Sequence, residues 1–490
     1  MRKFLPVLVF ATFFAATTVK AQVRYIDEIF QDVQVDTTIT YAQNYDFLTG
    51  FASLQPLVMD VYRPVGDTAT NRPLILLSHN GSFLPEALTQ ALLGMCFNGR
   101  KDSAITELCK RFARRGYVAV SFDYRLGWSA TASLQATRTK TIIQAVYRAM
   151  QDSKSLVRYF KNDFATNSNS YGIDTGKIII GGSNSGAYVA LAASCMNDTN
   201  ELNNIKFVDG NGPFIKQDTI GDFDGFGGVQ NYGTYPGISS RFQGVLALGG
   251  AVGDSSWIQA GETPVIAFHG VDEGGTNFNT GIVTTSTGQP VIEVSGSGDF
   301  MPIVDALGNN NILKPNNFQQ GPPNKNGLGQ QTTPVEGLYP FYGQKFEPWN
   351  WFDPTCYNGS ALMQTITPGS SPTKAALYID TIMGYALPRL YKILINNSYQ
   401  GPLGVEEIKN TTDVSIFPNP ASSEISVTVN SAESVSNIQI ADVTGRIAKE
   451  ISSINTYRQN IDVSDLNSGV YLLTLKLADG NVATKRIVIE

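Results

Sequence analysis

Between residues 55 and 270, short apolar segments alternate with longer amphipathic ones, and this alternation narrows the possible folds more than any other property of the sequence. Several of the short segments are apolar on both faces, which is typical of strands buried inside a parallel sheet. Residues 104–115 and 140–160 place apolar side chains at helical spacing, so we predict helices that connect the strands. The predicted strands are Leu57–Tyr62, Leu74–Ser78, Val118–Phe122, Lys177–Ile180, Val245–Leu248 and Val265–Phe268. The segment predicts an α/β domain with a mostly parallel sheet and helices on both faces.

The remainder of this domain, which we bound at 22–400, has a different composition. Residues 270–359 are rich in Gly, Asn, Pro and Gln and show little periodicity. They predict a long loop excursion above the sheet. A helix is expected again over 375–394, where it closes the domain.

A linker at 401–412 precedes a C-terminal segment of β character. Residues 413–490 carry β-branched, alternating segments separated by turn residues, which predicts a small all-β sandwich. Its predicted strands are Ile425–Val429, Ile438–Val443, Arg446–Ile451, Val470–Leu477 and Lys485–Ile489.

The first 21 residues have the pattern of a signal peptide. A basic start, Met1–Lys3, precedes an apolar run, Phe4–Ala16, and a small residue, Ala21, at the expected cleavage point. The apolar run is shorter than the roughly 20 residues that a membrane-spanning helix needs. We expect cleavage after Ala21 and a mature chain, without a transmembrane segment, that is secreted or held at the cell surface.

Composition and charge exclude some functions. A chain of 490 residues with 42% hydrophobic and 16% charged residues can bury a large core. Its net charge of -6 lacks the basic footprint of a nucleic-acid-binding protein. The four cysteines, Cys96, Cys109, Cys195 and Cys356, fit no zinc motif, and no metal or cofactor is expected. Export permits disulfides, and three full pairings are open; closeness in sequence favours Cys96 with Cys109.

Four motifs within residues 50–395 resemble the α/β-hydrolase superfamily, in its secreted carboxylesterase and lipase branch. They correspond to an opening strand, an oxyanion-type loop, a strand end with its turn, and the helix before the nucleophile strand. In that order they are Leu57–Pro64, His79–Phe83, Phe122–Gly127 and Ala145–Asp152. The resemblance implies the α/β-hydrolase fold and an ester hydrolase whose serine, acid and histidine follow one another along the chain.

Residues 413–490 resemble the type A sorting domain of the type IX secretion system. The matching pieces are Phe417–Pro420, Asp442–Arg446, Leu466–Tyr471 and the basic pair Lys485 and Arg486. The resemblance implies handling by the type IX machinery and export across the outer membrane. It also implies that the domain is removed or anchors the chain to surface lipopolysaccharide. We expect the cut between Leu403 and Asp413.

The family nucleophile stands in a Gly-x-Ser-x-Gly pattern at a sharp turn between a strand and a helix. Here the segment 181–187 reads GGSNSGA. Keeping both motif glycines, as Gly182 and Gly186, places Asn184 at the nucleophile position; Ser183 and Ser185 are the alternatives, and each loses at least one glycine. Asn tolerates the positive φ of this turn, but its amide is not a competent nucleophile.

The acid and the base complete the expected triad. Glu273, with Asp272 beside it, falls where the family carries its acid. The base should follow, but the two histidines of the protein, His79 and His269, both lie at or before this segment. Phe346 occupies the best match to the family's histidine position. The sequence therefore predicts a degenerate triad.

These departures favour an exported pseudoenzyme that serves as a binding or surface module for an unknown small-molecule or glycan ligand. The alternative is an active secreted ester hydrolase that uses Ser183 and a non-standard base. In both cases we expect the loop of Asn80, Gly81 and Ser82 to offer backbone amides to a bound oxygen, with Ser185 beside it.

Overall fold

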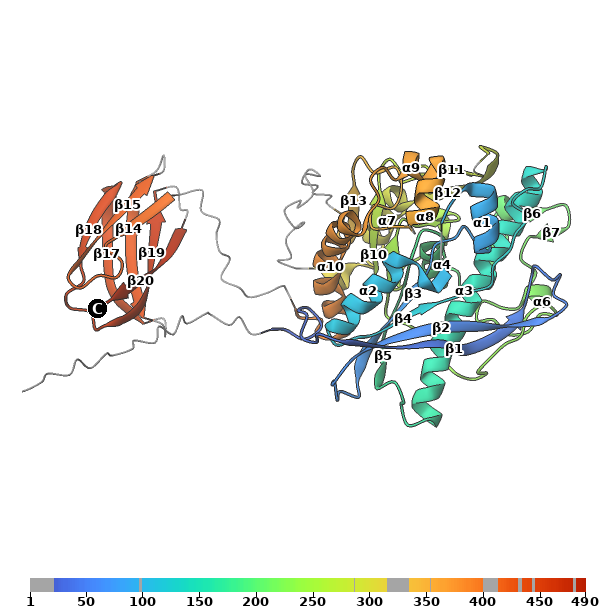
Figure 1. Ribbon diagram of the computed structural model, residues 1–490, viewed down its shortest axis with the longest axis horizontal. Coiled ribbons are helices and arrows are strands. Elements are labelled where there is room, and N and C mark those ends of the chain that lie inside the picture. The colour runs from blue at the N-terminus through green and yellow to red at the C-terminus, as the bar shows by residue number, and fades with distance from the viewer. Residues whose placement is uncertain are drawn as a thin grey trace, which may run out of the picture. The chain divides into compact units, whose positions relative to one another are not determined.

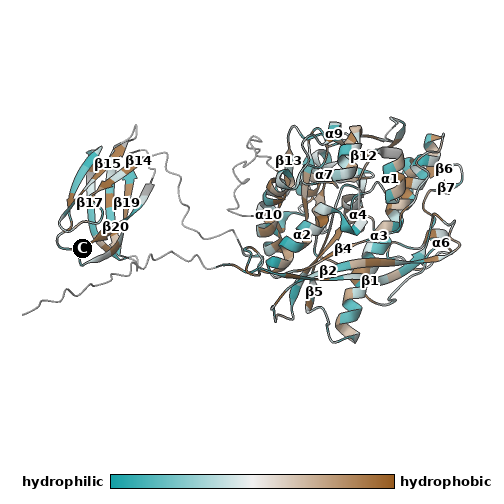
Figure 2. Cartoon of the chain, viewed as in Figure 1, coloured by the Kyte–Doolittle hydropathy of each residue, from teal (hydrophilic) through white to brown (hydrophobic). Residues whose placement is uncertain are grey.

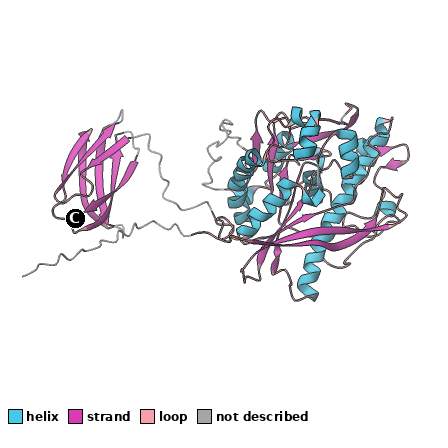
Figure 3. Cartoon of the chain, in the orientation of Figure 1, coloured by secondary structure: helices cyan, strands magenta, loops and turns pink. Residues whose placement is uncertain are grey.

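The structure, a computed structural model, describes residues 22–96, 99–285, 287–314, 335–352, 354–399, 413–430, 434–442, 446–478 and 482–490. The chain separates into two compact units, one up to Gly401 and one from Pro402. Figure 3 shows helices and strands in the first unit and strands in the second. The predicted signal peptide, the cleavage point and the linker at 401–412 lie outside the described residues. Among the described helices, none has the length and apolar content required to cross a membrane.

A single large sheet forms the centre of the first unit. Within the described residues it has eight strands in the order β1-β2-β4-β3-β5-β8-β10-β13. The strands are β1 (Val33–Tyr45), β2 (Leu54–Pro64), β3 (Arg72–Ser78), β4 (Val118–Phe122), β5 (Ile173–Ser183), β8 (Gly244–Leu248), β10 (Val265–Gly270) and β13 (Leu338–Phe341). Neighbours from β4 to β13 are parallel, whereas β1 and β2 are antiparallel to each other and β2 to β4. This confirms the predicted, mostly parallel α/β architecture.

Helices cover both faces of this sheet. Helices α2 (Ser103–Arg114) and α10 (Pro372–Leu394) pack into one buried core, and α3 (Gln135–Thr166) and α4 (Ser185–Cys195) into another (Figure 1). Figure 2 shows hydrophilic and hydrophobic residues along both α2 and α3. Helix α2 buries one face, whereas the middle of α3, from Ala145 to Arg158, is buried on all sides. The Asp102 side chain starts α2 by accepting hydrogen bonds from the amides of the first turn.

The long excursion after β10 is more ordered than the sequence predicts. It contributes β13 to the main sheet, and β12 pairs with β11 and β9 in a small antiparallel sheet. Its other elements are β11 (Gly281–Thr284), β12 (Pro290–Gly296), α7 (Ser297–Ala306) and α8 (Pro354–Gly359). Helix α9 (Ala361–Ile366) follows the excursion. The prediction of a long loop excursion is wrong for these residues, because the few apolar residues of β12 are buried against the core around α3.

Shorter elements complete the unit. These are α1 (Glu86–Leu93), α5 (Thr199–Leu202), α6 (Gln217–Ile220), β6 (Val208–Asp209), β7 (Gly212–Pro213) and β9 (Ala251–Val252), with 3-10 turns at Gly99–Lys101, Ile205–Phe207, Ser255–Trp257 and Asn311–Leu313.

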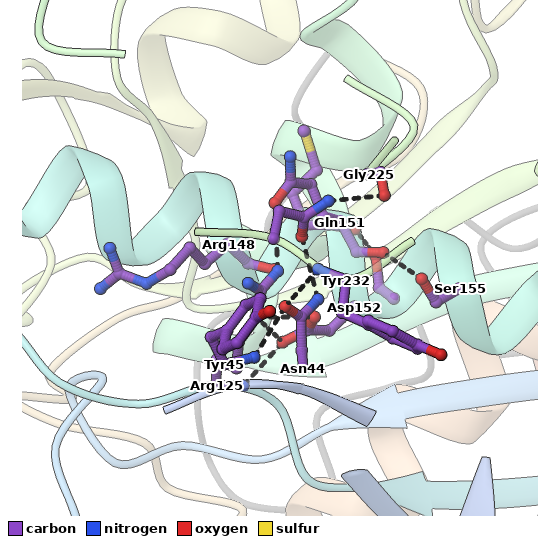
Figure 4. Close-up of polar contacts among 12 residues, drawn as sticks. Asn44, Tyr45, Arg125, Arg148, Gln151, Asp152, Ser155, Gly225 and Tyr232 are labelled. Carbon is purple, nitrogen blue, oxygen red and sulfur yellow. Dashed lines mark hydrogen bonds and ion pairs between the residues drawn. The ribbon is translucent and has the colours of Figure 1, made fainter. Parts of the chain in front are cut away.

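A buried ion pair fixes the residues that follow β4 to helix α3 (Figure 4). The Arg125 Nε donates to both carboxylate oxygens of Asp152 at 2.9 and 3.0 Å, and the Arg125 amide donates to the same carboxylate at 2.8 Å. Both side chains are fully buried. The Arg125 guanidinium also donates to the carbonyl of Arg148 and to the side chain of Gln151. Gln151 in turn donates to the Asp222 carbonyl, so the pair also positions the loop after α6.

A disulfide joins Cys96 to Cys356, with their Cα atoms 6.1 Å apart. The preference for Cys96 with Cys109 is therefore wrong. Cys109 points from α2 into the core beneath the sheet, where it is fully buried and unpaired, so closeness in sequence did not bring the two together. The bond instead links the segment after α1 to α8, across 260 residues of sequence.

Because the disulfide closes so long a loop, its removal should lower stability strongly. We expect Cys356→Ser to reduce the free energy of unfolding by about 2–5 kcal/mol. Chemical denaturation of the oxidised protein and the variant measures this difference. Adding a reductant should lower the free energy of unfolding of the unmodified protein to that of the variant, and should leave the value of the variant unchanged. Equal free energies of unfolding for the two proteins without reductant would contradict the prediction.

The second unit is a sandwich of two antiparallel sheets. Within the described residues, one sheet has the order β14-β15-β18 and the other β17-β16-β19-β20. The strands are β14 (Asp413–Phe417), β15 (Glu424–Asn430), β16 (Val435–Asp442), β17 (Ile447–Thr456), β18 (Arg458–Asp462), β19 (Gly469–Leu477) and β20 (Val482–Ile489). Their inward aliphatic side chains form a separate core. The predicted all-β sandwich is confirmed, with β14 and β18 in addition to the five predicted strands.

Candidate active site

Asn184 occupies the sharp turn between β5 and α4. Its φ is 44°, in the left-handed region, and it immediately precedes the first residue of the helix. The predicted position and backbone conformation of Asn184 are confirmed. Both flanking glycines are required by close contact: a Cβ on Gly182 would lie 2.4 Å from the Ser78 hydroxyl oxygen, and one on Gly186 would lie 2.2 Å from the Ser78 carbonyl oxygen. The turn therefore packs directly on the end of β3 and presents Asn184 above the sheet.

The Asn184 amide contacts the predicted acid directly. Its Nδ2 donates to Oε1 of Glu273 at 2.8 Å. Glu273 is buried, and burial raises the pKa of its carboxyl well above the ordinary value, with a further contribution from Glu347 and despite the hydrogen bond from Asn184. Asp272 is exposed and accepts a hydrogen bond from the Gly343 amide instead. Of the two predicted acids, only Glu273 lies at the turn.

The two alternative serines lie on either side of Asn184 in different environments. Ser183 is the last residue of β5; it is fully buried, and its hydroxyl accepts a hydrogen bond from the Trp349 indole at 3.0 Å. Ser185 lines the cavity above the turn, and its hydroxyl lies 3.1 Å from the Tyr124 hydroxyl. Neither serine occupies the turn itself.

The oxyanion-type loop follows β3 and faces the turn. Gly81, Ser82 and Phe83 all have positive φ, at 146°, 53° and 57°. Two consecutive non-glycine residues in this region carry strain of order 1–3 kcal/mol each, which the surrounding structure must offset. The Gly81 amide donates to the Asn80 side-chain oxygen at 2.6 Å. The loop is thus held in a fixed, strained shape beside Asn184.

A second buried carboxyl, which no motif of the sequence marks, supports this loop. Glu347 accepts hydrogen bonds from Asn80 Nδ2 and Asn350 Nδ2, both at 2.9 Å. Burial and the neighbouring Asp102 raise the pKa of Glu347 to about 8. Burial also raises the pKa of Asp102 to about 6. The only hint in the sequence is that an acid stands inside an aromatic stretch next to Phe346.

The two histidines are held by other groups, although Nε2 of His269 lies 3.8 Å from Oε2 of Glu273. His269 is fully buried; its Nδ1 lies 2.9 Å from the Ser297 hydroxyl and its Nε2 3.0 Å from the Thr276 carbonyl, so Nε2 carries the proton. Burial lowers the pKa of His269 to about 4. His79 is stacked on Tyr124, and burial lowers its pKa as well. Both imidazoles are therefore neutral and engaged in the core.

Phe346 lies beside Gly275, near both Asn184 and Glu273. A Cβ built on Gly275 would lie 3.6 Å from the Phe346 ring, 3.9 Å from Asn184 Nδ2 and 3.9 Å from Glu273 Oε1. The three side chains thus converge on one point. The correspondence of Phe346 with the family's histidine stays a prediction.

A cavity of about 350 Å³ opens above the turn. Asn80, Ser82, Asn184 and Ser185 line it together with many apolar side chains. It lies outside the carboxyl ends of β3, β5 and β10, where the strand order reverses between β3 and β5, as is usual for ligand sites in open α/β sheets. The site is a preformed, largely apolar cavity with a polar patch at the turn.

Two family models match the chain. Residues 59–227 match the BD-FAE family, and residues 415–490 match the family described as the secretion system C-terminal sorting domain. The chain combines an esterase-like α/β-hydrolase domain with a secretion sorting domain. The sorting domain marks the chain for handling by the type IX secretion system, with export and attachment at the cell surface. No curated protein matches the chain.

Solved structures similar to this chain include esterase 2 of Thermogutta terrifontis, a planctomycete. Its apo form is 15% identical, covers 77% of this chain and 98% of its own, and has a TM-score of 0.36. The propionate-bound form is 16% identical, with coverages of 70% and 94% and a TM-score of 0.36. The form phosphoramylated by tabun is 17% identical, with coverages of 68% and 92% and a TM-score of 0.35.

The buried carboxyls make the stability of the hydrolase domain depend on pH. In the unfolded chain a glutamic acid titrates near about 4.3, whereas Glu347 keeps its proton to about pH 8 in the folded state. Between these values the folded state binds more protons than the unfolded one, so the free energy of unfolding falls as pH rises. Each unit of difference between the pKa values of the folded and unfolded states corresponds to about 1.4 kcal/mol in the free energy of unfolding.

We therefore expect Glu347→Gln to lose less stability than the unmodified protein between pH 5 and pH 9. Thermal melting across this range measures the effect. Glu293→Gln, at an exposed glutamate, is the matched control and should follow the unmodified protein. Parallel pH profiles for Glu347→Gln and the unmodified protein would contradict the assignment of the titrating group.

Proposed function

We propose that the hydrolase domain is a binding module that does not hydrolyse esters. The observation that carries this proposal is the hydrogen bond of Asn184 to Glu273. An amide stands at the nucleophile position, and the acid that would orient a histidine contacts that amide directly. An amide is neither a nucleophile for acyl transfer nor a group that a base activates.

The rest of the site supports binding. The strained loop at 81–83 and the two close-packed glycines of the turn are retained, although each carries a conformational cost. The cavity above them is preformed and largely apolar, which is the usual character of a small-molecule site. Export by the sorting domain would place this module outside the cell.

Ester turnover by the purified full-length protein tests the proposal. With p-nitrophenyl acetate and butyrate, we expect the same rate for the unmodified protein and for Asn184→Ala, at the level of an unrelated protein of equal concentration. Saturable turnover that is lost in Ser183→Ala or Ser185→Ala would contradict it and would support the alternative of an active hydrolase.

A further inference from the structure

The main chain at Asn184 has a conformation that regular elements do not use. Its ψ is −108°, whereas ψ is about −42° in helices and about +135° in strands. Because the substituents of a tetrahedral Cα lie a third of a turn apart, this ψ places the Ser185 nitrogen and the Asn184 Cβ on the same side of the Cα–C bond, nearly eclipsed. Rotation of the side chain about Cα–Cβ then brings its Cγ towards that nitrogen, as the closure of a five-membered ring requires.

Hydrogen bonds on both sides of Asn184 maintain this conformation. The Asn184 amide donates to the Leu248 carbonyl at 2.7 Å, and the Tyr188 amide donates to the Asn184 carbonyl at 3.1 Å. The close-packed Gly182 and Gly186 hold the chain before and after the turn. Fixing two reacting groups in the geometry of attack is a large part of the acceleration in intramolecular reactions.

The attacking and the leaving nitrogen both stand in surroundings that favour such a ring closure. Ser185 is the first residue of α4, and the first amides of a helix have no intrahelical acceptor. The positive end of the helix dipole favours this nitrogen as it loses its proton. The Asn184 Nδ2 donates to Oε1 of Glu273, and burial raises the pKa of that carboxyl well above its ordinary value. An acid therefore lies beside the nitrogen that would leave.

We infer that Asn184 is a self-modification site, at which the Ser185 amide displaces the side-chain nitrogen and water then converts residue 184 to aspartate. The Ser185 nitrogen loses its proton and bonds to Cγ, the bond from Cγ to Nδ2 breaks, and Nδ2 leaves with a proton as ammonia. Asn184 lines the cavity, from which water opens the cyclic imide. The net reaction consumes one water and releases one ammonia, so it needs no oxidant or reductant.

The modification changes what the turn offers to a ligand. It replaces an amide by a carboxyl group beside Glu273, and two carboxyls in contact cannot both ionise easily. A newly made chain thus presents an amide at the turn, and an older chain presents an acid. Water that adds to the main-chain carbonyl instead would give isoaspartate, which lengthens the main chain between Gly182 and Gly186. Because both glycines pack tightly on β3, we expect aspartate as the main product.

Peptide mass spectrometry of the full-length protein, incubated for days at neutral pH in heavy-oxygen water, tests this modification. We expect residue 184 to exchange its amide for a carboxyl group with one heavy oxygen at least about tenfold faster than Asn167 does, because its geometry favours attack. Asn167 is the matched control, since it also precedes a serine and is exposed, but its ψ is 28°. Unfolding in urea should slow Asn184 to the rate that Asn167 has in the same urea.

Two variants identify the reacting groups. Ser185→Pro removes the attacking N–H and suits the first position of a helix, so it should abolish the conversion of Asn184. Glu273→Gln should slow the conversion, because an amide does not supply a proton to the leaving nitrogen, and should leave Asn167 unchanged. Conversion in the folded protein no faster than at Asn167, an equal rate for Asn184 in urea, or conversion that persists in Ser185→Pro would overturn the inference. The comparison with urea needs no variant and decides the question if Ser185→Pro does not fold.

Discussion

The combination Asn184→Ser with Phe346→His is expected to hydrolyse p-nitrophenyl butyrate about 10²–10⁴-fold faster than either single variant, the range that a positioned general base contributes. The introduced imidazole would lie between the introduced hydroxyl and Glu273, because these side chains converge near Gly275. Neither single change suffices, because nucleophile and base act as a unit. In Asn184→Ser alone the introduced hydroxyl has no imidazole to take its proton; burial raises the pKa of the nearby Glu273 carboxyl well above its ordinary value.

The matched control is Asn184→Ala with Phe346→His, which has the imidazole and no hydroxyl. Steady-state kinetics and circular dichroism on all four variants separate catalysis from misfolding. Rates that merely multiply the effects of the single variants, or a control as fast as the combination, would contradict the view that Phe346 stands in the place of a base.

Asp152→Asn is expected to lower the free energy of unfolding by about 3–5 kcal/mol, because it leaves a buried guanidinium without its counter-ion. The carboxylate of Asp152 holds Arg125 through its side chain and its amide, and Arg148, fully buried nearby, already has its pKa lowered to about 9 by burial and by Arg125. Without the negative charge of Asp152, the guanidinium groups of Arg125 and Arg148 would repel each other in the core.

Chemical denaturation measures this loss against Asp380→Asn, which removes an aspartate paired with Arg111 at the surface. The control should cost less than about 1 kcal/mol, as exposed pairs do. Similar losses of unfolding free energy in the two variants would show that the buried pair of Arg125 with Asp152 stabilises the fold no more than an exposed ion pair does.

The central fold was predictable because burial leaves a simple pattern in the sequence. Strands such as β3 and β4 are buried along their whole length, so their sequences are mostly apolar on both faces. The edge strand β1 alternates irregularly and is partly exposed, and β13 has four residues, so neither gave a readable period. The disulfide depended on α8 meeting the segment after α1, which is a tertiary contact that no local pattern encodes.

The candidate site was predictable where the spacing of the motif residues alone determines which residue occupies the turn. Two glycines fixed the register of the turn, and Asn184 followed from them. The choice between Glu273 and Asp272 was not decidable locally, because adjacent residues after a strand point in different directions. Glu347 could not be identified from the sequence, because its role depends on a hydrogen bond from Asn80, which lies 267 residues away in the sequence. The cavity likewise depends on residues that are far apart in the sequence.

The proposed absence of a working nucleophile is tested most directly by treating the full-length protein with a fluorophosphonate probe and measuring its intact mass. A serine activated by a base would be labelled at its hydroxyl, whatever ester the protein prefers. We predict that the mass of the unmodified protein does not change, while the combination of Asn184→Ser with Phe346→His gains one probe. Stoichiometric labelling of the unmodified protein, at Ser183, Ser185 or any other serine, with loss of ester turnover, would contradict the proposed function.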